Sequence, residues 1–329
     1  MAFRIAPLWW PVLAVASPVI APWLLVRNRR FQRDRERVAA LNQERINRAI
    51  PLDLPELDFL ELTALVEWKA QPGFMGDAGV SYLLRTNLGT MLYDVGFGPT
   101  RPALRHNAAR LGFTLDQVDA LAISHLHLDH MGGLMAQRAR QVQVLDEWLG
   151  SEPKPCFLPD RARAEGFRAE QVTQPRVLCA GIASTGPLAR SFFVTGGIEE
   201  QALVAHIKGK GLVVLTGCGH PTIEVILAMV KRLSDLPIYA IGGGLHFPVT
   251  GGRGSRAGVH IQSILGTGKP PWQRITDEDL TRTLAAINAA GPERVYLSAH
   301  DTCDRALDRM KKELAAETHV LEAGAVYRL

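Results

Sequence analysis

Apolar and charged positions divide the chain into an uncharged N-terminal stretch and a longer part of mixed pattern. Residues 5–26 contain no charged side chain, and a helix of this length crosses a hydrocarbon core about 30 Å thick. Trp9 and Trp23 lie near the two ends of the stretch, where a bilayer favours aromatic rings. Membrane helices tolerate the prolines of this stretch as kinks. The pattern therefore predicts a membrane anchor over residues 1–26, with one N-terminal transmembrane helix in residues 5–26.

Two other interpretations of the apolar stretch stay open. A cleaved signal peptide would use Ala14 to Ala16 as its small-residue site, although its positively charged region would be thin and the apolar run continues beyond that site. A buried core helix would satisfy the same composition. The uncleaved anchor accounts best for the length of the stretch and its aromatic ends.

An arginine-rich segment, Arg27 to Arg37, follows the apolar stretch. It holds six arginines against Asp34 and Glu36, so it alone supplies a charge equal to the formal net charge of the whole chain, +4. Such a cluster stays on the cytoplasmic side of a membrane, which predicts a single-pass protein with a cytoplasmic C-terminal domain. Anionic lipid headgroups attract the same charges. Because the rest of the chain is nearly neutral, no nucleic-acid partner is expected. If this segment is only the solvated start of a helix, the orientation of the chain across the membrane stays open.

The part after the anchor divides into a connecting segment and one large domain. Residues 27–58 are expected to form a basic juxtamembrane helix and a linker, with an amphipathic helix over residues 38–50 and a proline-containing linker over residues 51–58. Residues 59–329 are expected to form the catalytic domain. The four cysteines contain no CxxC pair and fit a reducing compartment.

Strand-like runs in this domain end beside residues with metal-binding or catalytic chemistry. The runs lie at residues 80–86, 89–96, 120–125, 211–217, 238–244 and 294–300, and the first two predict a hairpin. Helical patterns separate several of them, at residues 221–233, 276–289 and 303–316, with Thr276 as the N-cap of the second. This alternation predicts layered α/β architecture with a functional site on one rim.

The strongest chemical signal is the segment SHLHLDHMGG, which starts at Ser124. It places four possible metal ligands, His125, His127, Asp129 and His130, within six residues. Neutral imidazoles and a carboxylate are the donors that zinc and similar metals accept. Alternating histidines in an extended segment point to the same side. The segment therefore predicts a metal site.

This HxHxDH segment resembles the signature of the metallo-β-lactamase superfamily of metallohydrolases. The resemblance extends over about residues 75–329, because LYDVGFG, LTGCGHP, GGGLH and HDT follow in the order of that superfamily's site segments. They are most similar to the branch of the dihydropterin ribofuranosylaminobenzene phosphate synthases. The resemblance implies a four-layer αββα sandwich behind the N-terminal transmembrane helix.

The same resemblance implies roles for individual residues. One metal would be held by His125, His127 and His220, and a second by Asp129, His130 and His300. The cofactors would be two divalent metal ions, zinc first, with manganese or iron as alternatives. Cys218 is either a ligand or a small buried residue beside His220. The catalytic residues would be Asp129, as an acceptor for the attacking hydroxide, Asp94, which would orient a ligating histidine, and His246, which would contact the substrate.

Departures from the branch affect the region around the substrate. The branch has a histidine before its first hairpin strand, where this chain reads DAGVS from Asp77, and Leu128 replaces a more common tyrosine. The last motif reads HDTC, not HCTG. The resemblance therefore does not imply that this chain acts on the pterin-pathway substrate of that branch.

The leading functional prediction is hydrolysis of an anionic ester, phosphodiester or cyclic phosphate by a hydroxide held between two metals. Residues 247–276 contain no acidic residue before Asp277 but four cations, Arg253, Arg256, Lys269 and Arg274, and predict a mobile lid for an anionic small molecule. A solvated loop, or a loop that touches lipid headgroups, is the alternative for this segment.

Two other functions remain in competition. A lactone or thioester hydrolase would use the same metals on neutral substrates and would not need the lid's cations. A membrane-tethered sensor module would bind metal without turnover. The sequence leaves the oligomeric state open.

Overall fold

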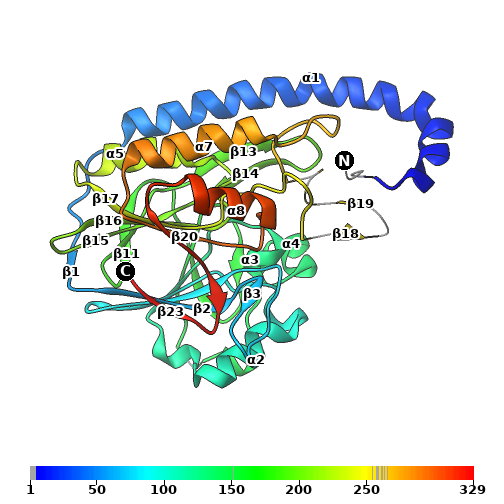
Figure 1. Cartoon of the computed structure of the whole chain (residues 1–329). Helices are drawn as coiled ribbons and strands as arrows, with labels where there is room; N and C mark the ends of the chain where they lie inside the picture. The colour runs from blue at the N-terminus through cyan, green and yellow to red at the C-terminus, as the bar shows by residue number, and fades with distance from the viewer. Residues whose placement is uncertain are drawn as a thin grey trace.

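Two mixed β-sheets pack face to face in the computed structural model of the chain, with helices on both outer faces (Figure 1). The structure describes residues 5–150, 152–253, 255–256, 259–260, 262, 264 and 266–329. The eight-stranded sheet consists of β11 (Arg176–Cys179), β12 (Ile182–Ser184), β15 (Leu203–Ile207), β16 (Gly211–Thr216), β17 (Ile238–Gly243), β20 (Arg294–Leu297) and β21 (Glu317–Val320), with β1 (Glu56–Leu57) beside β15. The seven-stranded sheet consists of β10 (Phe167–Gln171), β8 (Lys154–Leu158), β6 (Ala120–Ala122), β5 (Gly89–Tyr93), β4 (Ser81–Thr86), β2 (Leu60–Val66) and β23 (Val326–Arg328).

Three apolar cores separate the four layers. Side chains of both sheets, such as Leu62, Tyr82 and Val213, fill the space between the sheets. A second core joins the eight-stranded sheet to its helices, and a third joins the seven-stranded sheet to the others. The helices are α1 (Trp10–Arg48), α2 (Pro102–Leu111), α3 (Leu128–Met131), α4 (Leu134–Ala139), α5 (Ile223–Leu233), α7 (Asp277–Ala290) and α8 (Asp304–Glu313). The expected αββα sandwich is confirmed.

Most predicted elements are present, with shorter ends. Strands β4 and β5 form the expected hairpin, with Thr86 opposite Gly89. Thr276 caps α7 through a capping box with Asp279, so both backbone amides at that helix start are satisfied. Strands β6 and β20 end three residues before His125 and His300, respectively. The histidines therefore lie on loops just beyond the strand ends.

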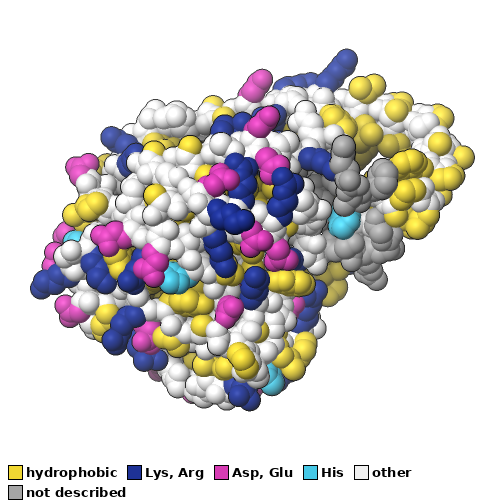
Figure 2. Space-filling model, viewed as in Figure 1, with side chains coloured by type: hydrophobic (Ala, Val, Ile, Leu, Met, Phe, Trp, Pro, Cys, Tyr) yellow, Lys and Arg dark blue, Asp and Glu magenta, His cyan; other side chains and the backbone are white. Residues whose placement is uncertain are grey.

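Helix α1 is one continuous helix, so the separate helix expected over residues 38–50 is its last part. Its N-terminal portion is apolar and exposed, with Val15 85% and Val19 78% exposed, and Figure 2 shows hydrophobic side chains gathered on this projecting end. It is the one candidate membrane span among the described residues, and none of its apolar window is buried against the rest of the chain. That exposure argues against a core helix. Within the expected linker, β1 adds to the eight-stranded sheet.

The C-terminal half of α1 is fastened to the hairpin of β13 (Leu188–Phe192) and β14 (Gly196–Glu200). The side chain of Asn42 is buried, donates to the carbonyl of Ala189 at 2.9 Å and accepts from its amide at 2.8 Å. Arg45 forms a two-pronged ion pair with Glu199, and Phe31 is only 1% exposed. Residues 31–46 of the expected juxtamembrane segment are therefore packed as part of the folded domain.

We expect Asn42→Ala to lower the Tm of the full chain by about 5 °C, because it leaves a buried amide and a buried carbonyl without partners at a cost of about 2 kcal/mol. Thermal unfolding in detergent measures this shift. Asn47→Ala, on the exposed face of the same helix, is the matched control and should change Tm by less than about 1 °C. Equal shifts in the two variants would contradict this docking of α1.

Candidate metal centre

The candidate site lies where parallel strands of both sheets end at the same edge. Strands β5 and β6 run parallel in one sheet, and β16, β17 and β20 run parallel in the other. The loops after these strands carry, in order, Asp94, His125, Cys218, His246 and His300. Side chains that follow adjacent parallel strands converge at one rim. Segments up to two hundred residues apart in the chain are brought together in this way.

A first group consists of three imidazoles, those of His125, His127 and His220. His127 Nδ1 lies 3.0 Å from His125 Nε2 and 3.1 Å from His220 Nε2. Nitrogens about 2.05 Å from a tetrahedral zinc ion lie roughly 3.3 Å from one another. The ring of Phe192 packs against His127 and His220, with centroids 5.7 and 5.0 Å away, and holds both rings in place.

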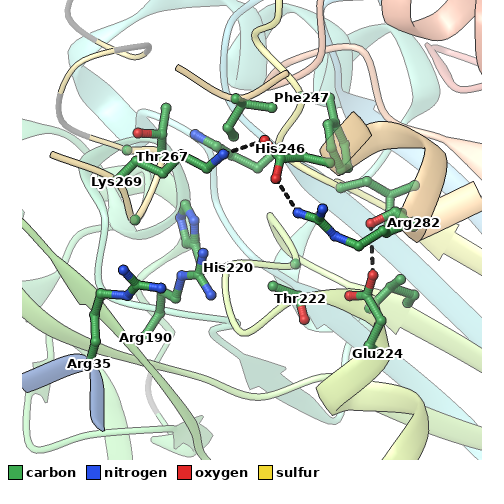
Figure 3. A pocket seen from close by; sticks show the side chains of 18 residues that line it. Arg35, Arg190, His220, Thr222, Glu224, His246, Phe247, Thr267, Lys269 and Arg282 are labelled. Atoms are coloured by element: carbon green, nitrogen blue, oxygen red, sulfur yellow. Dashed lines mark hydrogen bonds and ion pairs between the residues drawn. The ribbon is translucent and has the colours of Figure 1, made fainter. Parts of the chain in front are cut away.

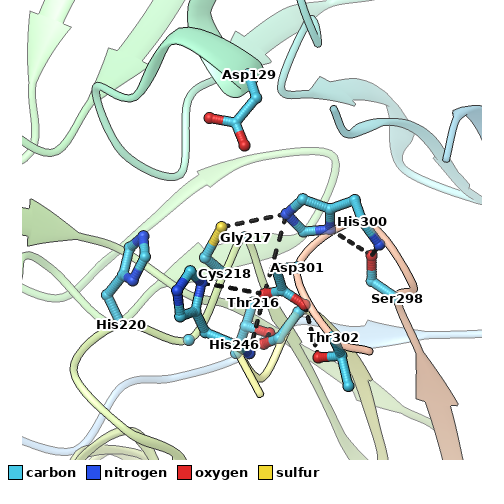
Figure 4. Close-up of polar contacts among 12 residues, drawn as sticks. Asp129, Thr216, Gly217, Cys218, His220, His246, Ser298, His300, Asp301 and Thr302 are labelled. Atoms are coloured by element: carbon cyan, nitrogen blue, oxygen red, sulfur yellow. Dashed lines mark hydrogen bonds and ion pairs between the residues drawn. The ribbon is translucent and has the colours of Figure 1, made fainter. Parts of the chain in front are cut away.

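A second group combines Asp129, His130, Cys218 and His300. Figure 4 shows Asp129, Cys218 and His300 of this group. Cys218 Sγ lies 3.2 Å from the Nε2 atoms of both His130 and His300. Asp129 Oδ2 lies 3.8 Å from His130 Nε2. The structure therefore places the Cys218 thiol among the possible ligand atoms of the second group.

His246 adjoins the first group. Its ring centroid lies 4.8 Å from that of His220, and it also falls within reach of Cys218. It is only 8% exposed, and neither ring nitrogen has a hydrogen-bond partner among the described residues, although Nδ1 lies 3.9 Å from Asp301 Oδ2. Its backbone adopts φ 55°, a left-handed conformation that is rare for histidine and is commonest where function requires it.

Burial keeps most of these imidazoles neutral. Burial and the neighbouring histidines lower the pKa of His125, His220 and His300 well below the ordinary value, and burial lowers the pKa of His127 to about 3. Neutral imidazole is the form that binds metal. His130 differs: burial lowers its pKa, but the carboxylates of Asp94 and Asp129 outweigh burial and raise it to about 9.

Asp94 supports the HxHxDH segment from behind. Its Oδ2 lies 2.7 Å from His130 Nδ1 and accepts from Ser124 Oγ, and its Oδ1 accepts from the Ser124 amide. The carboxylate is fully buried. A carboxylate on the second nitrogen of a ligating histidine fixes its tautomer and orientation, which is the arrangement expected for Asp94.

Glu200 is a supporting residue that the sequence analysis missed. Its carboxylate accepts from the backbone amides of Gly217, Cys218, Gly219 and His220, at 2.8 to 3.1 Å. Burial raises its pKa to about 7, while these hydrogen bonds oppose that rise. It thereby fixes the loop that presents Cys218 and His220. The only sign of Glu200 in the sequence is that it is an acidic residue at the end of a strand.

A second missed group stands behind His300. The buried carboxylate of Glu67 accepts from Tyr82 and Ser298, and Ser298 Oγ lies 2.5 Å from His300 Nδ1. Asp301 accepts from the amide of His246 at 3.0 Å. Each donor group at the rim is therefore held by a buried acid from another part of the fold.

A close approach of two loops requires glycine at Gly217. A Cβ atom there would collide with the side chain of Ser124, which contacts Asp94, His125 and His130. The loop after β16 can therefore reach the HxHxDH segment only without a side chain at this position.

A cavity of about 450 Å³ opens beside the first group (Figure 3). His220 and His246 form part of its wall, together with the cations Arg35, Arg190, Lys269 and Arg282 and the carboxylates Glu224 and Asp279. Four cations against two carboxylates leave an excess of positive charge. Such a cavity favours anions.

The expected lid cations have different surroundings. Arg253 donates to the carbonyls of Ala299 and Thr302 and pairs with Asp304, so it fastens loops together and does not face a substrate. Lys269 lines the cavity and pairs with Asp279. The side chain of Arg256 lies outside the described residues. Of the remaining histidines, His106 contacts only the carbonyl of Gly73 among the described hydrogen bonds and belongs to neither donor group.

The donor set fits two divalent metal ions. The first group offers three imidazole nitrogens, and the second offers two nitrogens, one carboxylate and one thiol. Nitrogen, sulfur and carboxylate oxygen in this mixture suit zinc, and three histidines with an open position are typical of catalytic zinc sites.

Comparison with known proteins agrees with this geometry. The sequence model of the metallo-beta-lactamase superfamily matches residues 75–141. The 7,8-dihydropterin-6-methyl-4-(beta-D-ribofuranosyl)-aminobenzene-5'-phosphate synthase of Methanocaldococcus jannaschii is 21% identical over 235 residues, which cover 59% of this chain and 80% of that protein. The crystal structure of a metal-dependent hydrolase of the beta-lactamase superfamily superposes with a TM-score of 0.58 and 21% identity, covering 82% of this chain and 98% of that one. The chain thus has the metallo-β-lactamase fold and carries that superfamily's motif at its rim.

Proposed function

We propose that this chain is a metal-dependent hydrolase of an anionic ester, phosphodiester or cyclic phosphate, with residues 59–329 as its catalytic domain. The observation that carries this proposal is the pair of adjoining donor groups at one rim, where His220 of the first group lines a cavity with excess positive charge. A site that holds metal only for structure is closed, whereas this one borders a space large enough for a small molecule.

In this proposal His125, His127 and His220 hold one divalent ion, and Asp129, His130 and His300, with Cys218, hold the other. When bound, two such ions supply Lewis acidity and lower the pKa of water toward neutrality. The Asp129 side chain keeps 22% of its surface exposed, so it can accept a hydrogen bond from the attacking water. Asp94 orients His130, and the ring nitrogens of His246, which have no hydrogen bond among the described residues, can bond to the substrate.

The test is turnover of bis-p-nitrophenyl phosphate by the full chain in detergent, after loading with Zn²⁺ or Mn²⁺ and again after chelation. The proposal predicts hydrolysis that requires metal and returns when metal is restored. Metal-loaded protein that hydrolyses a lactone or thioester but no phosphodiester would overturn the assignment of substrate class.

We further propose that α1 anchors the chain in a membrane by a single span and that the catalytic domain is cytoplasmic. The exposed apolar end of α1 and the arginines from Arg27 to Arg37 support this orientation. A C-terminal green fluorescent protein fusion should fluoresce in the membrane fraction, and a C-terminal alkaline phosphatase fusion should be inactive, because the phosphatase needs an oxidising compartment.

Replacing Arg27, Arg29, Arg30 and Arg33 together by neutral residues should weaken the preference for this orientation. The phosphatase fusion should then gain activity, and the fluorescent fusion should lose fluorescence. An active phosphatase fusion of the unmodified chain, or fluorescence in the soluble fraction, would contradict the proposed orientation or the anchor.

A further inference from the structure

Two cations of the cavity have no carboxylate partner among the described side chains. Among the described residues, the side chain of Arg35 on α1 is hydrogen-bonded only to Gln32, and the side chain of Arg190 on β13 forms no hydrogen bond or ion pair. In contrast, Lys269 and Arg282 both pair with Asp279. Burial and the nearby charge of Arg35 lower the pKa of Arg190, while the carboxylates of Glu224 and Asp279 act in the opposite direction without contacting it. Two like charges in one cavity repel each other unless an anion lies between them.

The unpaired cations lie next to the candidate metal centre. Figure 3 shows Arg35 and Arg190 on the side of the cavity where His220 projects. The first turn of α5 also lines the cavity and has no side-chain cap, so its amides add partial positive charge. If an anionic group of a substrate is bound by these cations, the adjoining atoms of that substrate lie next to the donor groups.

An aromatic cluster, consisting of Trp23, Phe31, Phe193 and Trp272, connects this part of the molecule with the apolar end of α1. Phe193 contacts the other three rings edge-on, with centroids 5.3 to 6.4 Å apart. Arg27 donates to the carbonyls of Phe193 and Val194 and so ties the tip of the β13–β14 hairpin to α1. Trp23 and Trp272 remain 52% and 50% exposed.

The cluster and the cavity therefore adjoin the same helix. Trp23 belongs to the apolar stretch, and Arg35 follows roughly three helical turns later. Phe193 follows Phe192, which packs on His127 and His220. Exposed aromatic rings beside cations at the end of an apolar helix match the boundary of a bilayer, where acyl chains meet charged headgroups.

We propose that the cavity binds the phosphate-bearing head of a membrane lipid, between Arg35 and Arg190, while its acyl chain lies along the aromatic cluster. This inference rests on the proposed function and assigns its substrate class. It also gives α1 a purpose beyond anchoring, because the helix contributes one of the two binding cations and places the cavity at the membrane surface.

Calorimetry with alkylphosphonates tests this assignment, because their carbon–phosphorus bond is not hydrolysed. The metal-loaded full chain in dodecyl maltoside is titrated with octylphosphonate, which has a head and a chain, and with methylphosphonate, which has the head alone. Heats of titration into protein-free micelles are subtracted. We expect octylphosphonate to bind at least tenfold more tightly than methylphosphonate, and octyltrimethylammonium not to bind.

Variants separate the two parts of the site. Arg35→Gln and Arg190→Gln should each weaken both phosphonates at least tenfold, whereas Arg33→Gln, an exposed cation on the same helix that does not line the cavity, should change neither. Trp272→Ala should weaken octylphosphonate alone. Arg35 is exposed, so Arg35→Gln is expected to fold. It therefore still tests the site if Arg190→Gln fails to fold.

Three results would overturn the inference. Equal affinity for the two phosphonates would indicate a water-soluble phosphate ester. Unchanged binding in the Arg35 and Arg190 variants would place the anion elsewhere, and absence of binding would reject the site. The calorimetry measures binding alone, so it is independent of the hydrolysis assay. If one of these three results is obtained and the chain still hydrolyses a phosphodiester, the lipid assignment is rejected and the hydrolase proposal stands.

Discussion

Replacing His125 by alanine is expected to reduce kcat/KM for bis-p-nitrophenyl phosphate by on the order of 10³. The His125 ring is fully buried, and its Nε2 lies 3.0 Å from His127 Nδ1 within the first donor group. Its Nδ1 lies 2.9 Å from Ser124 Oγ, which also contacts Asp94. The substitution removes one possible metal-binding nitrogen from the first group. It also removes a contact of Ser124, which together with Asp94 supports His130 in the second group.

The matched control is His106→Ala, at a partly exposed histidine whose ring contacts the carbonyl of Gly73. It should keep kcat/KM within about twofold. Circular dichroism and Tm of both variants establish that the fold is retained. A folded His125→Ala protein with the activity of the unmodified chain would contradict the assignment of the first donor group.

The second large effect is expected at Glu200. In Glu200→Ala four buried amides lose their acceptor, which costs on the order of 5 kcal/mol and approaches the whole stability of an ordinary domain. We expect little folded protein from this variant. Glu200→Gln keeps the oxygen that serves Gly217, Cys218 and Gly219 but turns an amide group toward the His220 amide.

The glutamine variant should therefore fold and bind metal 10- to 100-fold more weakly, as expected when support of a ligand is disturbed. Competition with a chelator of known affinity measures this change. Glu199→Ala is the control, because the neighbouring Glu199 forms a partly exposed ion pair with Arg45, and its loss should cost less than about 1 kcal/mol. Metal affinity unchanged in Glu200→Gln would contradict the proposed role of Glu200.

The sequence predicted the parts of the fold and site that depend on short segments. Four donors within six residues from His125 to His130 are visible without a structure, and strand patterns that stop before His220 and His300 place them at one rim. The predicted site residues do lie together in space. Thr276 was likewise predicted as the N-cap of α7, and the capping box that it forms there involves Asp279, only three residues away.

Long-range contacts could not be predicted in the same way. Glu67 reaches Ser298 across more than two hundred residues, and nothing in its local sequence distinguishes it from an ordinary strand residue. The docking of Asn42 on Ala189 and the placement of Arg35 in the cavity depend on how α1 crosses the β13–β14 hairpin. Cys218 stayed ambiguous because its neighbours, His130 and His300, become neighbours only in the folded chain.

Metal content measured by inductively coupled plasma mass spectrometry on the full chain, purified and then loaded with Zn²⁺, tests the central claim most directly. Two adjoining donor groups predict two zinc ions per chain, close to one in Asp129→Ala or in His127→Ala, and close to two in the His106→Ala control. No bound zinc, or a single ion that is retained in both ligand variants, would contradict a dinuclear centre at this rim.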